Sequence, residues 1–110
     1  LEEGLSLPPQ TAAFVRAFAG GDALALTELL VPMEKWKRDA LIPVLSGWLA
    51  LLEEALAGYR EISTLAGEIA ARRTAPDIYR AIQTLQKALT YAQGNVSPGA
   101  ICGWLAWALR

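Results

Sequence analysis

Hydrophobic residues recur at spacings of three and four along nearly the whole of this 110-residue chain. That spacing is the period of one face of an α-helix, and alternation with the period of a β-strand is nearly absent. Alanine and leucine dominate, whereas the β-branched residues valine and isoleucine are sparse. The pattern therefore predicts an all-α protein, a compact bundle of five to six helices that forms one domain over residues 1–110.

Glycine and proline residues divide the first third of the chain into two predicted helices. The first is expected over residues 9–19, because proline suits a first helical turn and Gly20-Gly21 suit a C-terminus. Asp22 is a good N-cap for a second helix that runs to about Leu30 and is ended by Pro32.

The longest helix is predicted over residues 34–58. Between Leu45 and Leu52 only Ser46 and Gly47 interrupt the apolar residues, so this helix is apolar on more than one side. Pro43 lies inside the pattern and removes one backbone hydrogen bond. A kink near residues 39–43, or a break into two helices, is therefore expected.

Three further helices are predicted in the second half of the chain. One spans about residues 62–73, and the next begins at Pro76-Asp77 and ends at Gly94-Asn95. The last begins at Ser97, a good N-cap followed by a proline, and runs to Leu109.

Residues 88–109 form a run of 22 residues without a charge, which raises the question of a membrane span. The glycine and proline residues between 94 and 99 divide this run, and its second part, residues 99–109, covers only about 17 Å of helix. A span needs about 20 residues to cross about 30 Å. The uncharged part of the long helix, residues 40–52, is also too short. We therefore expect no membrane span and a final helix that docks onto protein.

Composition narrows the function classes further. Hydrophobic residues make up 54% of the chain, so some apolar surface is expected to face outward and to meet a partner. The net charge is −1, which does not favour nucleic-acid binding. The basic residues cluster weakly around Lys35–Arg38 and at Arg72-Arg73, and we interpret both clusters as solvated helix ends.

Residues that could act in catalysis or bind a metal or cofactor are scarce. The chain has no histidine and a single cysteine, Cys102, in an apolar context, which fits a buried thiol in a reducing cytosol. Phosphate-binding glycine loops and metal-ligand spacings are absent from the sequence. The adjacent pair Glu53-Glu54 points in two directions on a helix and is interpreted as surface. We expect no catalytic, cofactor or metal site.

The four tryptophans are the more informative residues. Trp104 and Trp107 lie three apart on the last helix and diverge by about 60°, so at least one should reach the edge of the core. Tryptophan is enriched at interface hot spots. A helix–helix interface through the last helix, the long helix or both is therefore expected.

Two stretches, FVRAFAGGDALALTELLVPMEKWKRDALIPVLSGWLALLEEAL and IYRAIQTLQKALTYAQGNVSPGAICGWLAWALR, cover most of the chain. They resemble the C-terminal collar domain of the delta-prime subunit of the bacterial DNA polymerase III clamp loader. The matching features are Gly21-Asp22 before the second helix, Lys37-Arg38-Asp39 before the long helix, and Asn95 before an apolar final helix. The final helix of that family usually carries more polar residues than this one.

The resemblance implies a bundle of five or six helices that serves in assembly during DNA replication. Collar domains of five subunits pack into a ring that holds the ATPase modules, which load the sliding clamp on primed DNA. Delta-prime does not hydrolyse ATP itself. On this reading the chain is a cytoplasmic fragment, its nucleotide-fold and zinc-binding modules lie upstream of Leu1, and its partners are the gamma/tau and delta subunits. No nucleic-acid contact by this fragment is implied.

The same resemblance suggests packing roles for individual residues. Asn95, with Ser97, would cap or turn the chain and fix the angle between the last two helices. Arg38 would form an ion pair across the bundle, or else be solvated. The candidate interface residues are Trp48, Leu51, Trp104 and Trp107.

Two alternatives to the interpretation as a collar domain remain. The chain could be an unrelated helical interaction or regulatory domain, including one that forms a homodimer through the same helices when isolated. It could also be an enzyme fragment, which the lack of histidine disfavours.

Overall fold

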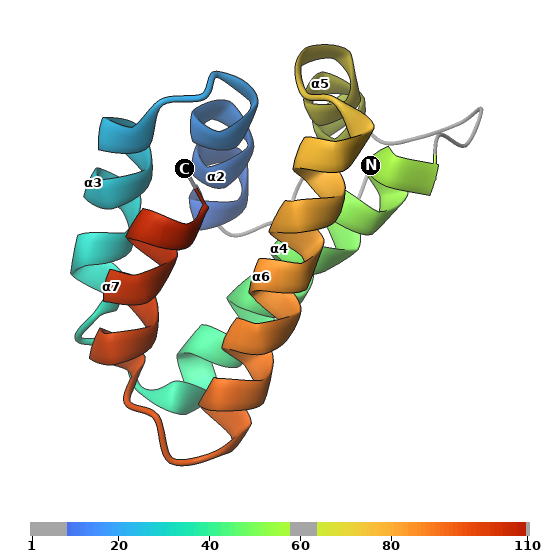
Figure 1. Ribbon diagram of the computed structural model, residues 1–110. Helices are drawn as coiled ribbons and strands as arrows, with labels where there is room; N and C mark the ends of the chain where they lie inside the picture. Colours follow the sequence, from blue (N-terminus) through green and yellow to red (C-terminus); the bar gives the residue numbers. More distant parts are fainter. Residues whose placement is uncertain (1–8, 58–63, 110) are drawn as a thin grey trace.

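The computed structural model describes residues 9–57 and 64–109, and these residues form helices and turns without a strand (Figure 1). The helices are α2 (Pro9–Ala19), α3 (Ala23–Met33), α4 (Arg38–Ala57), α5 (Thr64–Arg72), α6 (Ala75–Gln93) and α7 (Pro98–Ala108). This confirms the all-α bundle of five to six helices.

The two longest helices, α4 and α6, run antiparallel and make the most extensive pairing in the bundle (Figure 1). Helix α7 returns alongside α6 and packs antiparallel to α3 on its other side. Helix α2 contacts α3, α4 and α5. The final helix therefore lies between two neighbours within one compact bundle, whose radius of gyration is 13.1 Å.

One hydrophobic core joins these helices. The ring of Phe14 stacks on Trp48 with 4.5 Å between centroids and 7° between planes, and it lies 5.6 Å from the ring of Phe18. Each helix contributes fully buried side chains, among them Phe14, Leu30, Trp48, Ile69, Leu85 and Leu105. Burial of these side chains away from water stabilises the bundle.

The α2–α3 turn follows the sequence prediction closely. Gly21 has φ of 64°, the left-handed conformation that favours glycine, and Asp22 caps α3 by accepting a hydrogen bond from the Ala25 N–H at 3.0 Å. The predicted end of α3 at Pro32 is wrong, because the helix continues to Met33. Proline there removes only one hydrogen bond in a last turn that Glu34 closes, by donating to the Val31 and Pro32 carbonyls.

Helix α4 also differs from its prediction at two points. It begins at Arg38 instead of residue 34, because the longer α3 leaves residues 34–37 to make the turn. It also runs unbroken through Pro43, so of the two expected alternatives, a kink or a break into two helices, the break is wrong. Pro43 and Asp39 both lie on the exposed side of the helix, where water can satisfy the carbonyl that loses its N–H partner.

The last two helices are capped by hydroxyl groups. Helix α6 begins one residue earlier than expected, because Thr74 accepts a hydrogen bond from the Asp77 N–H at 3.3 Å. Ser97 caps α7 as predicted, by accepting from the Ala100 N–H at 3.2 Å. The expected start of the fourth helix at Ile62 falls outside the described residues, and that helix ends at Arg72.

Candidate interaction surface

The structure corrects the assignment of Trp48. Its side chain is 0% exposed and lies on the core face of α4, one turn from Leu45 and Leu52. It therefore belongs to the core of this fold and not to an outer surface. Leu51 is partly buried and packs against the same core.

The two tryptophans of α7 take different positions, as their 60° divergence predicted. Trp104 is half-buried, and its ring meets Tyr91 of α6 edge-on, with centroids 5.5 Å apart and planes at 67°. Trp107 is 68% exposed. It is the candidate interface residue with the most accessible apolar surface.

Exposed apolar side chains are also present on α3, the antiparallel neighbour of α7. Leu24 is 67% exposed and Val31 is 50% exposed. On α7 the outward positions Ala100 and Gly103 precede Trp107 on the same side of the helix. We call these five residues the α3–α7 face. Charged residues near this face include Glu28, on the outward side of α3, and Glu34, which follows α3 and lies beside the start of α7.

Arg38 does not form the predicted ion pair. Within residues 9–57 and 64–109 no carboxylate lies within salt-bridge distance of it, and its Nη2 donates to the Val96 carbonyl at 3.0 Å. This bond ties the start of α4 to the turn between α6 and α7. Sequence spacing gave no signal for it, since the two residues are 58 positions apart.

Asn95 lies in that same turn, as predicted, and is exposed. The C-cap of α6 is its neighbour Gly94, whose N–H donates to the Thr90 and Tyr91 carbonyls. Ser97 makes the capping hydrogen bond on the other side of the turn. The angle between α6 and α7 is therefore held by Arg38 and Ser97, through contacts that the structure shows directly.

The interpretation of the second basic cluster, Arg72-Arg73, as a solvated helix end is wrong for Arg73. Its Nη1 donates to the Phe18 carbonyl at 2.9 Å, and its guanidinium lies 4.5 Å from the centre of the Phe18 ring. Its Nε lies 3.5 Å from a carboxylate oxygen of Asp77. Arg73 therefore fastens the end of α2 to the start of α6.

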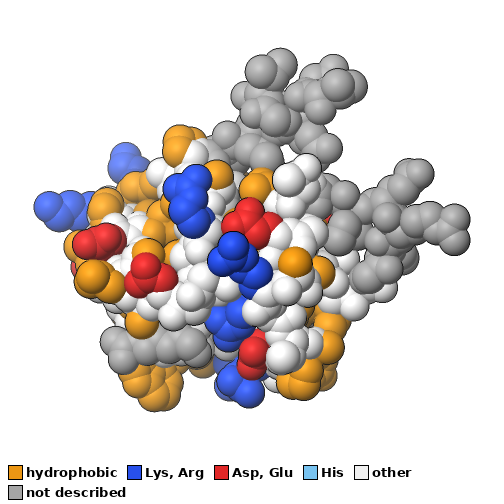
Figure 2. All heavy atoms as spheres, turned by 90° about the horizontal axis from the view of Figure 1, so that it is seen from above, with side chains coloured by type: hydrophobic (Ala, Val, Ile, Leu, Met, Phe, Trp, Pro, Cys, Tyr) orange, Lys and Arg blue, Asp and Glu red, His pale blue; other side chains and the backbone are white. Residues whose placement is uncertain are grey.

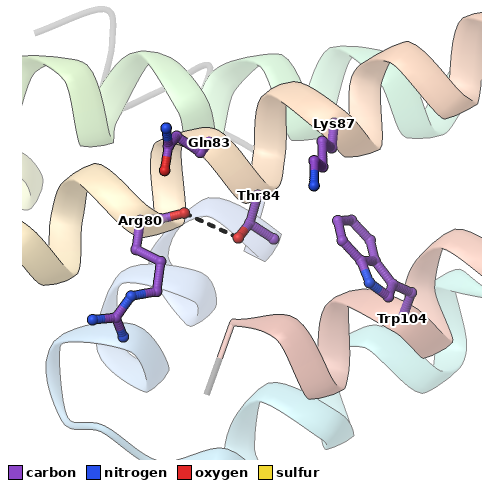
Figure 3. A pocket seen from close by; sticks show the side chains of 5 residues that line it. All are labelled: Arg80, Gln83, Thr84, Lys87 and Trp104. Atoms are coloured by element: carbon purple, nitrogen blue, oxygen red, sulfur yellow. Dashed lines mark hydrogen bonds between the residues drawn. The ribbon is translucent and has the colours of Figure 1, made fainter.

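A groove between α6 and α7 brings together four polar side chains and an indole, with a volume of about 290 Å³ (Figure 3). Its residues are Arg80, Gln83, Thr84, Lys87 and Trp104. The four α6 residues were not singled out from the sequence, nor connected with Trp104. Their spacing of three, four and seven was the available signal, because it puts them on one flank of the helix.

Figure 2 views the bundle from the end opposite the α6–α7 turn, where basic and acidic side chains are interspersed with apolar ones. Among the described residues no group of three or more His, Cys, Asp or Glu side chains could hold a metal ion. Burial, with a smaller effect of Glu34, raises the pKa of the Cys102 thiol to about 11. That thiol stays protonated at neutral pH and is a poor nucleophile.

Within the part of the chain that the structure describes, only helix α4 has the length and the apolar composition of a membrane-spanning helix. Its face with Leu41, Leu45, Trp48 and Leu52 fills the core of the bundle. A core helix of this kind passes the same test, and we assign α4 to the core.

Comparisons of the chain with protein-family models, with curated proteins and with solved structures gave no match.

Proposed function

We propose that this chain is an assembly domain that joins helical subunits through its α3–α7 face, as the collar domain of a clamp-loader delta-prime subunit would. The observation that carries the proposal is the exposure of Trp107, 68%, on a helix that has no charged residue from Pro98 to Ala108. One side of α7 fills the core, and the opposite side presents a large apolar group to a partner.

The resemblance of the two long sequence stretches to delta-prime collar domains supplies the identity of the proposed partners. These are the collar domains of the gamma/tau and delta subunits, in a cytoplasmic complex that loads the sliding clamp during replication. The observed helical bundle is compatible with this assembly role. The domain would contribute assembly, while ATP hydrolysis belongs to other modules of the complex.

The surface area of Trp107 sets the size of the expected effect. A tryptophan buries up to about 250 Å². The 68% that is exposed amounts to about 170 Å², or about 4 kcal/mol at about 25 cal/mol per Å². Side-chain ordering reduces this gain, and hot-spot truncations commonly cost at least about 2 kcal/mol, which is about thirtyfold in affinity.

The test is reconstitution with purified gamma/tau and delta collar fragments, followed by size-exclusion chromatography with light scattering and by titration calorimetry. Trp107→Gln should weaken association by about thirtyfold or more. Tyr79→Gln is the matched control, because Tyr79 is an aromatic residue, 54% exposed, on the outer side of α6. Its affinity should stay within about twofold of the wild type.

Two outcomes would overturn the proposal in different ways. If the wild-type chain binds neither fragment and stays monomeric, the proposed assembly role is wrong. If it forms a homodimer that Trp107→Gln disrupts, the α3–α7 face is an interface but the collar identity is wrong. The second outcome would favour the alternative, a helical interaction domain that self-associates.

A further inference from the structure

The groove between α6 and α7 has an excess of positive charge. Arg80 and Lys87 line it, and none of its lining residues is acidic. Asp77 is the nearest acidic residue on this flank of α6. It lies 3.5 Å from Arg73, and the Arg80 charge, although it forms no salt bridge with Asp77, also helps to lower its pKa. Helix α7 contributes no charge to the opposite wall. In a chain of net charge −1, this groove therefore has two cations that are not neutralised by a salt bridge in the described structure.

The far wall of the groove is an aromatic surface held in place. Trp104 meets Tyr91 edge-on at 5.5 Å, which limits the rotation of the indole. In Figure 3 the Lys87 side chain points toward Trp104, and Thr84 lies between Lys87 and Arg80 along α6. The Thr84 hydroxyl donates to the Arg80 carbonyl at 3.0 Å, so its oxygen can still accept a hydrogen bond.

We propose that this groove binds an extended acidic peptide segment of a partner protein, with carboxylates at positions i and i+3. Arg80 and Lys87 are seven residues apart, about 10.5 Å along α6. In a polyproline II segment, residues i and i+3 lie on the same face about 9.3 Å apart. The flexible side chains of Arg80 and Lys87 can adjust to the difference between these two spacings. An apolar residue between the two carboxylates would lie against Trp104, and the Gln83 amide can pair with the peptide backbone.

The length of the charged stretch favours a peptide over a polynucleotide. Beyond Lys87, α6 carries no charge up to Gln93, and α7 adds none. A nucleic-acid strand would thus meet only two free cations in the groove, and its binding would depend weakly on salt, with a slope of about −1.4. The proposal does not depend on the proposed function, because the groove is lined by Trp104 and not by Trp107 or any other residue of the α3–α7 face.

The experiment titrates the 110-residue chain into a terminally blocked, fluorescein-labelled peptide, GSEPLESG, and measures fluorescence anisotropy. The Arg80→Gln/Lys87→Gln double variant should bind at least fivefold more weakly. Lys35→Gln/Lys37→Gln is the matched control, because it removes two exposed cations that do not line the groove, and its affinity should stay within twofold. The peptide GSQPLQSG, which lacks both carboxylates, should also lose at least fivefold.

Nuclear magnetic resonance provides the second readout, since the indole N–H signal of Trp104 should shift on addition of GSEPLESG while that of Trp107 does not. The proposal is overturned if no binding occurs at 2 mM peptide, or if the groove variant loses no more affinity than the control. It is also overturned if an eight-residue oligothymidylate binds more tightly than the peptide and loses that binding in the groove variant. Circular dichroism of each variant checks that the fold is intact.

Discussion

Trp48 allows a sharp test of how the core is held together, because two opposing effects act on one side chain. Its ring is fully buried and stacks on Phe14 at 4.5 Å. Its Nε1–H is also buried, without a hydrogen-bond partner in the described structure. Packing stabilises the folded state at this position, whereas the unpaired donor destabilises it.

The balance can be estimated for two substitutions. Trp48→Ala removes the ring and its stacking, and should cost about 3–5 kcal/mol. That is a large part of the stability of about 5–15 kcal/mol expected for a domain. Trp48→Phe keeps a ring against Phe14 and loses two ring carbons, worth about 1.6 kcal/mol. It also removes the unpaired N–H, which costs about 1–3 kcal/mol where it is buried. Its stability should stay within about 1.5 kcal/mol of the wild type.

Urea unfolding followed by far-ultraviolet circular dichroism measures both changes, with Trp107→Ala as the exposed control. That control should change the free energy of unfolding by no more than about 0.5 kcal/mol. A loss above about 2.5 kcal/mol for Trp48→Phe would refute the reasoning about the unpaired donor. A loss below about 2 kcal/mol for Trp48→Ala would refute the central place of Trp48 in the core.

Two other predictions concern helix starts. Ser97→Ala should cost about 1 kcal/mol, because it removes the cap of α7. Asn95→Ala should change stability by less than about 0.5 kcal/mol, since that side chain is exposed; equal losses in urea unfolding would contradict this assignment. Hydrogen bonding from Thr74, then the Arg73 guanidinium, holds the pKa of Asp77 below its ordinary 3.8. The stabilisation from the Asp77 carboxylate is therefore fully present above about pH 4 and is lost as pH falls through the lowered folded-state pKa. The difference in stability between the wild type and Asp77→Asn, measured from pH 7 to pH 2, should shrink over that acidic range; parallel curves would exclude this linkage.

Features that depend on neighbouring residues were predictable from the sequence by itself. The helical period, the glycine turn at Gly21 and the caps at Asp22 and Ser97 are set within a few residues along the chain. The divergence of Trp104 and Trp107 follows from helix geometry alone. These local rules were enough to predict the helix order and the all-α class.

Features that depend on residues far apart in sequence were decided only by the tertiary structure. Hydrophobicity alone did not separate the buried Trp48 from the exposed Trp107, because both lie on helices that are apolar on several sides. Arg38 donates to a carbonyl 58 positions away, and Trp104 lines the same groove as Lys87 only because α7 folds back along α6. Packing, through contacts that no local pattern encodes, determined which apolar groups fill the core and which remain for a partner.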